Sequence, residues 1–167
     1  ARVRRGDGSG DDLLAQGFQI AVALNEAQRL GPAGSALVEA GWLRGEPAAA
    51  VATVAPWYDE VLRYGYPTVA AQLGFWLRQA GHHVDMPAVD HPYTLLAEGR
   101  WREAADAWLA AGCAYEQALA LAASPDAADL LEALSIVDGL GAEPLARIVR
   151  TRLRDLGVAR IPRGPTP

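Results

Sequence analysis

A glycine followed by a stripe of aromatic and small residues constrains the fold of this chain more than any other feature. After Gly99, the residues Trp101, Ala104, Trp108 and Ala111 recur every three or four positions, which places them on one face of an α-helix. Large and small side chains alternate along this face, so a second helix can pack against it at close range. The pattern therefore predicts a helix hairpin that turns at Gly99, and it indicates a packing surface without chemistry of its own.

Comparable stripes, separated by glycine and proline, occupy most of the chain. Helical periodicity covers residues 13–24, 32–43, 47–64, 67–80, 92–98, 101–111, 115–122, 125–140 and 144–156. Pro56 should break the third of these helices, and the aperiodic residues 82–91 should form the longest loop. Gly65 should end the helix that precedes Pro67. The sequence predicts eight or nine helices and no strand.

Proline and serine indicate where several of these helices begin. Pro32, Pro67 and Pro144 suit the first turn of a helix, where the missing N–H costs nothing. Ser124 suits the N-cap of a helix that has Pro125 in its first turn.

The combination of a turn glycine and an alanine five residues later occurs three times, at Gly45 and Ala50, Gly99 and Ala104, and Gly141 and Ala146. Helices joined by short turns pack as antiparallel neighbours. The predicted fold class is all-α, a stack of antiparallel helix hairpins that forms a degenerate tetratricopeptide-like repeat.

Composition fits one soluble helical domain. The 167 residues are 51% hydrophobic and carry a net charge of −5, so the segment has no electrostatic reason to bind nucleic acid. No apolar run has the roughly 20 residues that span a bilayer, and the single cysteine suits a reducing cytoplasm. We expect a flexible segment over residues 1–10, one domain over 11–157, and an extended linker over 158–167 that leads to a further C-terminal module.

The second half of the chain contains an ordered series of short motifs: Pro92-Tyr93, Gly99-Arg-Trp101, Ala104-Ala105-Asp-Ala-Trp108, Gly112-Cys113-Ala-Tyr115-Glu116, Ala118-Leu119-Ala-Leu121, Leu140-Gly141-Ala142-Glu-Pro144, Leu153-Arg154-Asp-Leu156-Gly157 and Ile161-Pro162-Arg163-Gly164-Pro165. The first half adds Gln28-Arg29-Leu30, Glu39-Ala-Gly-Trp42-Leu43-Arg-Gly45 and Phe75-Trp76-Leu77-Arg78-Gln-Ala80-Gly81. In this order the motifs resemble the helical sensor region of large LuxR-type bacterial transcriptional regulators.

The resemblance implies a place between two other modules. Such regulators have a nucleotide-binding ATPase module before the helical region and a helix-turn-helix after it. This sequence departs from the pattern at Ala114, where the family has proline. It contains neither a phosphate-binding loop before Asp11 nor a helix-turn-helix after Pro165, so DNA binding and ATP hydrolysis would belong to the parent protein.

Two groups of residues suggest metal or redox chemistry, and each has a simpler interpretation. His82, His83 and His91, with Asp85 and Asp90, share one loop but lack the spacing of a zinc site, so a solvated loop is favoured. Adjacent to the hairpin helix, Cys113 suits a redox sensor if its pKa is lowered, and a small buried packing residue is favoured instead.

Charged residues likewise favour structural roles. Glu98, Glu103 and Asp106 alternate with Arg100 and Arg102, which is typical of a solvated helix face with local ion pairs. No nucleophile with a base at workable spacing is present, so we expect no enzyme and no cofactor.

The one basic excess is formed by Arg147, Arg150, Arg152, Arg154, Arg160 and Arg163. It could steer a neighbouring DNA-binding module toward phosphates. A solvated helix face is favoured, because no base-reading side chains are interleaved.

Aromatic residues divide into a predicted core and a predicted surface. Trp76, Trp101, Ala104, Trp108 and Tyr115 should be structural core. An exposed patch that binds a partner is predicted at Trp57, Tyr58, Tyr64 and Tyr66.

Together these observations predict a non-catalytic segment that senses a signal in a LuxR-type transcriptional regulator. Its partners would be the neighbouring modules and a protein or small-molecule effector, without nucleic acid or membrane, in the cytoplasm. The alternative is a free-standing tetratricopeptide-like adaptor that binds a partner protein or peptide.

Overall fold

The computed structural model describes residues 2–64 and 66–164. These residues contain ten α-helices and two 3-10 helices and no strand, which confirms the all-α prediction. The elements are η1 (Val3–Arg5), α1 (Gly10–Leu24), α2 (Ala27–Arg44), α3 (Ala48–Val54), η2 (Ala55–Trp57), α4 (Tyr58–Arg63), α5 (Pro67–Gln79), α6 (Pro92–Ala97), α7 (Trp101–Ala110), α8 (Ala114–Leu121), α9 (Ala127–Leu140) and α10 (Glu143–Asp155). With α3 and α4 taken as one helix broken at η2, the described residues form nine helical units.

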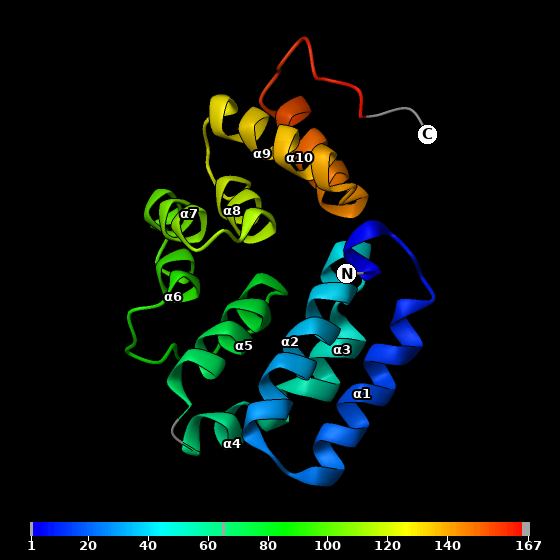
Figure 1. Cartoon of the computed structure of the whole chain (residues 1–167), viewed down its shortest axis with the longest axis vertical. Coiled ribbons are helices and arrows are strands. Elements are labelled where there is room, and N and C mark those ends of the chain that lie inside the picture. Colours follow the sequence, from blue (N-terminus) through cyan, green and yellow to red (C-terminus); the bar gives the residue numbers. More distant parts are fainter. Residues whose placement is uncertain (1, 65, 165–167) are drawn as a thin grey trace.

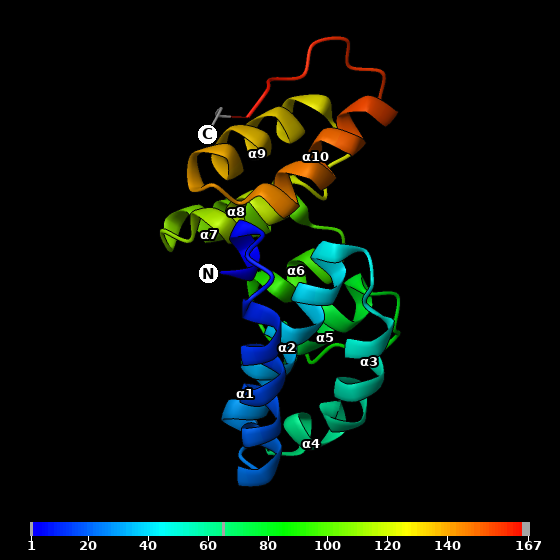
Figure 2. The same cartoon turned by 90° about the vertical axis from the view of Figure 1, so that its right-hand side faces the viewer.

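The helices form a curved stack in which neighbours in the chain are mostly neighbours in space. Packing runs from α1 to α2, from α2 to α5 and on to α6, and then successively through α7, α8, α9 and α10 (Figure 1). The stack bends so far that α10 returns to the end of α2, with η1 between them (Figure 2). We call α1–α5 the N-terminal half and α6–α10 the C-terminal half.

Proline sets several helix boundaries as predicted. Pro67 and Pro144 lie in the first turns of α5 and α10, and Pro56 converts one turn to η2, because proline lacks the N–H that an interior turn requires. The turn at Gly99 is also confirmed, with a φ of +79° that favours glycine. Gly65, predicted to end a helix, lies outside the described residues.

Two predicted helix starts are wrong. Pro32 lies inside α2, which begins five residues earlier at Ala27. The preceding Gly31 serves close packing and not helix termination, because a Cβ at this position would collide with Val69 of α5.

Ser124 also has a different role from the predicted N-cap. It lies two residues before the N-cap Asp126 of α9. Its fully buried hydroxyl accepts from the Asp126 N–H at 3.0 Å and donates to Asp129 Oδ2 at 2.6 Å.

The predicted core residues are buried to different degrees. Trp76, Ala104 and Tyr115 are buried, as predicted. Trp101 and Trp108 are only partly buried against the core, because α7 turns the alanine face of Ala104 toward its neighbours and the tryptophans flank that face.

An aromatic row links the two halves of the stack through α5 and α6. Trp76 lies 5.7 Å from Trp42 of α2 and 5.2 Å from Phe75, measured between ring centroids. Phe75 stacks on Tyr93 of α6 at 5.1 Å, and Tyr93 meets Trp108 of α7 edge to face at 5.2 Å. These separations suit favourable aromatic pairs, so the row forms a continuous apolar contact from α2 to α7.

Both ends of the described chain pack on the helices, and the flexibility predicted for residues 1–10 remains a prediction. Residues 3–5 form η1, and its Arg4 is paired with carboxylates of α2 and α8. The predicted extended linker is extended as far as Gly164, but it lies against the stack through Val158 and Ile161. Ala1 and residues 165–167 lie outside the described residues.

Within the described residues, no helix combines the length and the apolar character that crossing a membrane requires.

Candidate functional site

The predicted aromatic patch does not exist as one surface. Tyr58 is buried, and its hydroxyl donates a 2.6 Å hydrogen bond to the backbone carbonyl of Asp85. Trp57 is partly buried against the core. Only Tyr64 and Tyr66 are exposed, at 46% and 42%. The prediction is therefore wrong for Tyr58, and the partner-binding role of the other three remains a prediction.

The helix break explains the position of Tyr58. Because η2 changes the phase of the helix at Pro56, Tyr58 turns toward α5, where a Cβ at Gly74 would lie only 3.0 Å from its hydroxyl. Burial raises the pKa of Tyr58. The break at Pro56 was predicted, but the sequence did not reveal which side chain it turns toward α5.

The loop histidines do not gather around a common point. Within the described residues, no group of three or more His, Cys, Asp or Glu side chains could hold a metal ion. His91 instead caps α6, since its Nδ1 accepts from the Tyr93 N–H at 3.3 Å, and its ring stacks on Tyr93. Burial lowers the pKa of His91. His82 and His83 are exposed.

Cys113 is the N-cap residue of α8 and is partly exposed, so the prediction of a buried packing residue is wrong. Its Sγ lies 3.7 Å from the Ala111 carbonyl oxygen. Gly112, with a φ of +70°, forms the turn before Cys113.

The arginines of α10 divide into internal and exposed groups. Arg150 donates to both carboxylate oxygens of Asp138 at 2.7 and 2.8 Å. Arg152 donates to the carbonyls of Ala122 and Ser124. These two side chains hold α8, α9 and α10 together and are not part of a solvated basic face.

The hairpin helix α7 carries the predicted local ion pairs and one that the sequence analysis missed. Arg100 pairs with Glu98 at 3.2 Å and with Glu103 at 2.6 Å, and all three side chains are about half exposed. Arg102, by contrast, pairs with Asp129 of α9, whose side chain is buried.

The bend of the stack is fastened by Arg4 of η1. Its Nε and Nη2 donate to the two oxygens of Glu39 at 2.7 and 3.0 Å, and its Nη1 donates to Glu116 at 2.9 Å. The guanidinium carbon lies 3.9 Å from the ring centroid of Tyr115, within the range of a cation–π interaction. Because Glu39 belongs to α2 and Glu116 to α8, one side chain joins both halves; we call this the closure contact.

Charge and burial at the closure contact reinforce each other. Burial alone would lower the pKa of Arg4, but the hydrogen bond to Glu39 and the nearby charges outweigh it and raise that pKa. Burial and the charge of Glu39 raise the pKa of Tyr115. Arg4 is therefore held as a cation, and Tyr115 as a neutral phenol.

Beside the closure contact runs a groove between the two halves. It consists of three adjoining hollows of about 100, 390 and 100 Å³. The first two share Leu43, Arg44, Pro144 and Arg147, and the last two share Trp42, Ile148 and Arg152. We call these seven residues, which come from α2 and α10, the closure groove.

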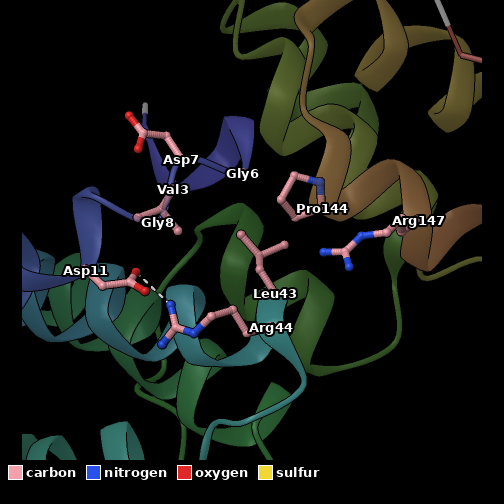
Figure 3. A pocket seen from close by; sticks show the side chains of 9 residues that line it. All are labelled: Val3, Gly6, Asp7, Gly8, Asp11, Leu43, Arg44, Pro144 and Arg147. Atoms are coloured by element: carbon pink, nitrogen blue, oxygen red, sulfur yellow. Dashed lines mark ion pairs between the residues drawn. The ribbon is translucent and has the colours of Figure 1, made fainter.

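The first hollow shows how the groove is arranged (Figure 3). Leu43 of α2 and Pro144 of α10 form its apolar part, beside the loop that joins η1 to α1. Arg44 forms an ion pair with Asp11, with 2.6 Å between Nη1 and Oδ1. Arg147 extends into the hollow from the opposite side, is exposed, and has no ion pair or hydrogen bond within the described part of the chain.

The closure groove thus combines an apolar floor with an uncompensated cation. Trp42 and Ile148 are partly buried against the core, so a ligand can cover their exposed surface at little conformational cost. Arg147 can donate hydrogen bonds to a carboxylate or phosphate. Such a lining can bind and orient a ligand.

Only one sequence signal pointed to this site, the basic excess on α10. Arg4 lies in a Gly- and Arg-rich segment without periodicity, and Trp42, Pro144 and Ile148 read as core or helix-start residues. Of this basic excess, Arg147 and Arg152 line the groove, and of these two only Arg147 is exposed.

Comparisons with protein-family models, with curated proteins and with solved structures found no significant match to this chain.

Proposed function

We propose that this chain is a non-catalytic helical-repeat module that receives a signal and transmits it to neighbouring modules of a LuxR-type transcriptional regulator in the cytoplasm. The observation that carries the proposal is the closure groove, which is lined by both halves of a curved helical stack. The ordered motifs that resemble the sensor region of such regulators support the family assignment.

The groove suits signal reception because its two walls belong to elements far apart in the chain. Trp42 and Leu43 end α2, whereas Pro144 and Ile148 lie on α10. A ligand bound across them favours one relative position of α2 and α10 over others, and that difference in affinity drives a shift in population. Stacked helices accommodate such shifts by small changes in packing.

The ligand should carry an acidic group and an apolar group. Arg147 supplies the cation, and Trp42 with Ile148 supplies the apolar surface. A peptide segment or a small molecule with a carboxylate next to an aliphatic or aromatic group meets both requirements.

The family assignment is tested by sequencing the gene beyond the codon for Pro167. A helix-turn-helix encoded shortly after it supports the regulator. A stop codon at that point rejects the regulator and leaves the free-standing adaptor, which the groove supports equally because the groove needs no neighbouring module to bind a peptide.

The role of the groove is tested by Arg147→Glu in the full-length parent protein. This change reverses the charge at the ligand site, so signal-dependent transcription from a reporter should be lost, while the helical circular dichroism stays unchanged. The matched control is Arg154→Glu, on the same helix, exposed and outside the groove lining. Equal responses from both variants would reject the groove as the signal site.

A further inference from the structure

The receiving side of the closure contact is a preformed site for a guanidinium group. Glu39 of α2 and Glu116 of α8 present carboxylates from helices far apart in the chain, and the Tyr115 ring forms the third wall. Glu39 is 5% exposed and Tyr115 is 8% exposed. Two carboxylates face one guanidinium, so the walls are electrostatically complementary to a cation, and the planar fork of arginine fits the paired oxygens of Glu39.

The site also has an unused polar group and room beside it. The buried hydroxyl of Tyr115 has no hydrogen-bond partner among the described residues. Next to Arg4 and Glu39 lies a hollow of about 380 Å³, which is also lined by Leu13, Leu14 and Ala36. A peptide that places an arginine between Glu39 and Glu116 would therefore find apolar surface for the residues next to it.

The segment that fills the site, η1, has no fully buried residue, and Val3 packs only partly buried against the core. Gly6, with a φ of +82°, begins the sequence Gly6-Asp-Gly-Ser-Gly10 that connects η1 to α1, and such Gly/Ser-rich connections are flexible. Arg4 therefore behaves as the anchor of a short tethered peptide.

We propose that the cleft between α2 and α8 is a recognition site for an arginine-bearing peptide segment, and that residues 2–6 occupy it as a built-in competitor. A partner that presents an arginine next to an aliphatic residue, as in Val3-Arg4, would displace η1 and open the bend of the stack. This inference concerns a cation site and does not rest on the proposed role of the closure groove or on the regulator assignment.

The test uses the full chain and a fluorescently labelled peptide of residues 2–10. In the unaltered chain the tethered segment competes at an effective concentration of about millimolar, so the peptide should bind weakly. Arg4→Ala in the chain removes the competitor, and fluorescence anisotropy should then show binding at least about tenfold tighter. Arg5→Ala is the matched control, because Arg5 is exposed in the same 3-10 helix and should leave binding unchanged.

Specificity is tested by changing the peptide instead of the chain. A peptide with Arg4→Ala should not bind the opened chain, whereas one with Arg5→Ala should bind like the original peptide. Equal binding of the two altered peptides would overturn the proposal.

A second variant keeps the test valid if Arg4→Ala does not fold. Arg4→Lys retains the positive charge against Glu39 and Glu116 but loses the forked hydrogen bonds, so it should fold and admit the peptide with intermediate affinity. If the folded variants bind the peptide no better than the unaltered chain does, the site does not recognise arginine in this way and the proposal fails.

Discussion

Two of the contacts that join the halves of this molecule differ in chemistry. The aromatic row through Trp76, Phe75 and Tyr93 is apolar and connects α5 to the next helix along the chain. The closure contact is ionic, and Arg4 reaches partners 35 and 112 residues away. The first contact supplies stability that salt hardly affects, whereas the second is partly exposed and therefore open to screening and competition. We therefore expect competition to disrupt the closure contact more readily than the aromatic row.

The largest effect is expected at the aromatic row. Trp76→Ala removes a fully buried ring that contacts both Trp42 and Phe75, and should lower the free energy of unfolding by about 3–5 kcal/mol. Urea denaturation measures it. Trp108→Ala, at the partly buried end of the row, is the comparison and should cost clearly less. Equal losses would show that the row is not graded from core to surface.

A smaller loss, with a modest salt dependence, is expected at the closure contact. Glu39→Gln removes the charge that accepts two hydrogen bonds from Arg4, and should cost about 1–3 kcal/mol. Because salt screens partly buried ion pairs less than exposed ones, the difference between variant and unaltered chain should shrink only modestly in molar salt. Glu103→Gln, which disrupts an exposed pair with Arg100, is the control and should change stability much less, because exposed ion pairs contribute little. A Glu39→Gln loss no larger than that of Glu103→Gln would contradict a stabilising ionic contact at Arg4.

The smallest effect should be a pH dependence at the edge of the aromatic row. Burial lowers the pKa of His91, which stacks on Tyr93 and meets Trp108. The unfolded chain therefore takes up a proton on acidification before the folded chain does. Stability should fall as the pH drops below the ordinary histidine pKa of about 6.5, and this loss should level off below the lowered pKa.

His91→Asn isolates that contribution, since asparagine can still cap α6 but does not titrate. Thermal melts between pH 5 and 8, a range that brackets the ordinary histidine pKa, should show a flatter profile for this variant, and His83→Asn in the exposed part of the loop should not. Identical pH profiles for the two variants would show that His91 does not cause this pH dependence of stability.

Local sequence patterns predicted the parts of the fold that local physics determines. The turn at Gly99, the break at Pro56 and the start of α5 at Pro67 each follow from backbone constraints within a few residues. Errors arose where packing between distant segments decided the outcome. Pro32 was predicted to begin a helix, because the close approach of Val69 to Gly31 is not visible in the local pattern.

The same limit applies to the candidate site. The closure contact needs Arg4, Glu39 and Glu116 to converge from separate segments, and an arginine in an aperiodic segment carries no pattern that points to its partners. The prediction that Tyr58 is exposed was wrong for a local reason: the break at Pro56 changed which face of the helix is buried.

The long sequence separations of the closure contact also govern the order in which the molecule forms and comes apart. Helical stacks nucleate locally and propagate to neighbouring units, so Glu39 and Glu116 come together only after the helices between them are in place. Contacts absent from the folding transition state act mainly on the unfolding rate. Arg4 is therefore expected to slow unfolding, and so to lengthen the lifetime of the folded chain, while leaving the folding rate nearly unchanged.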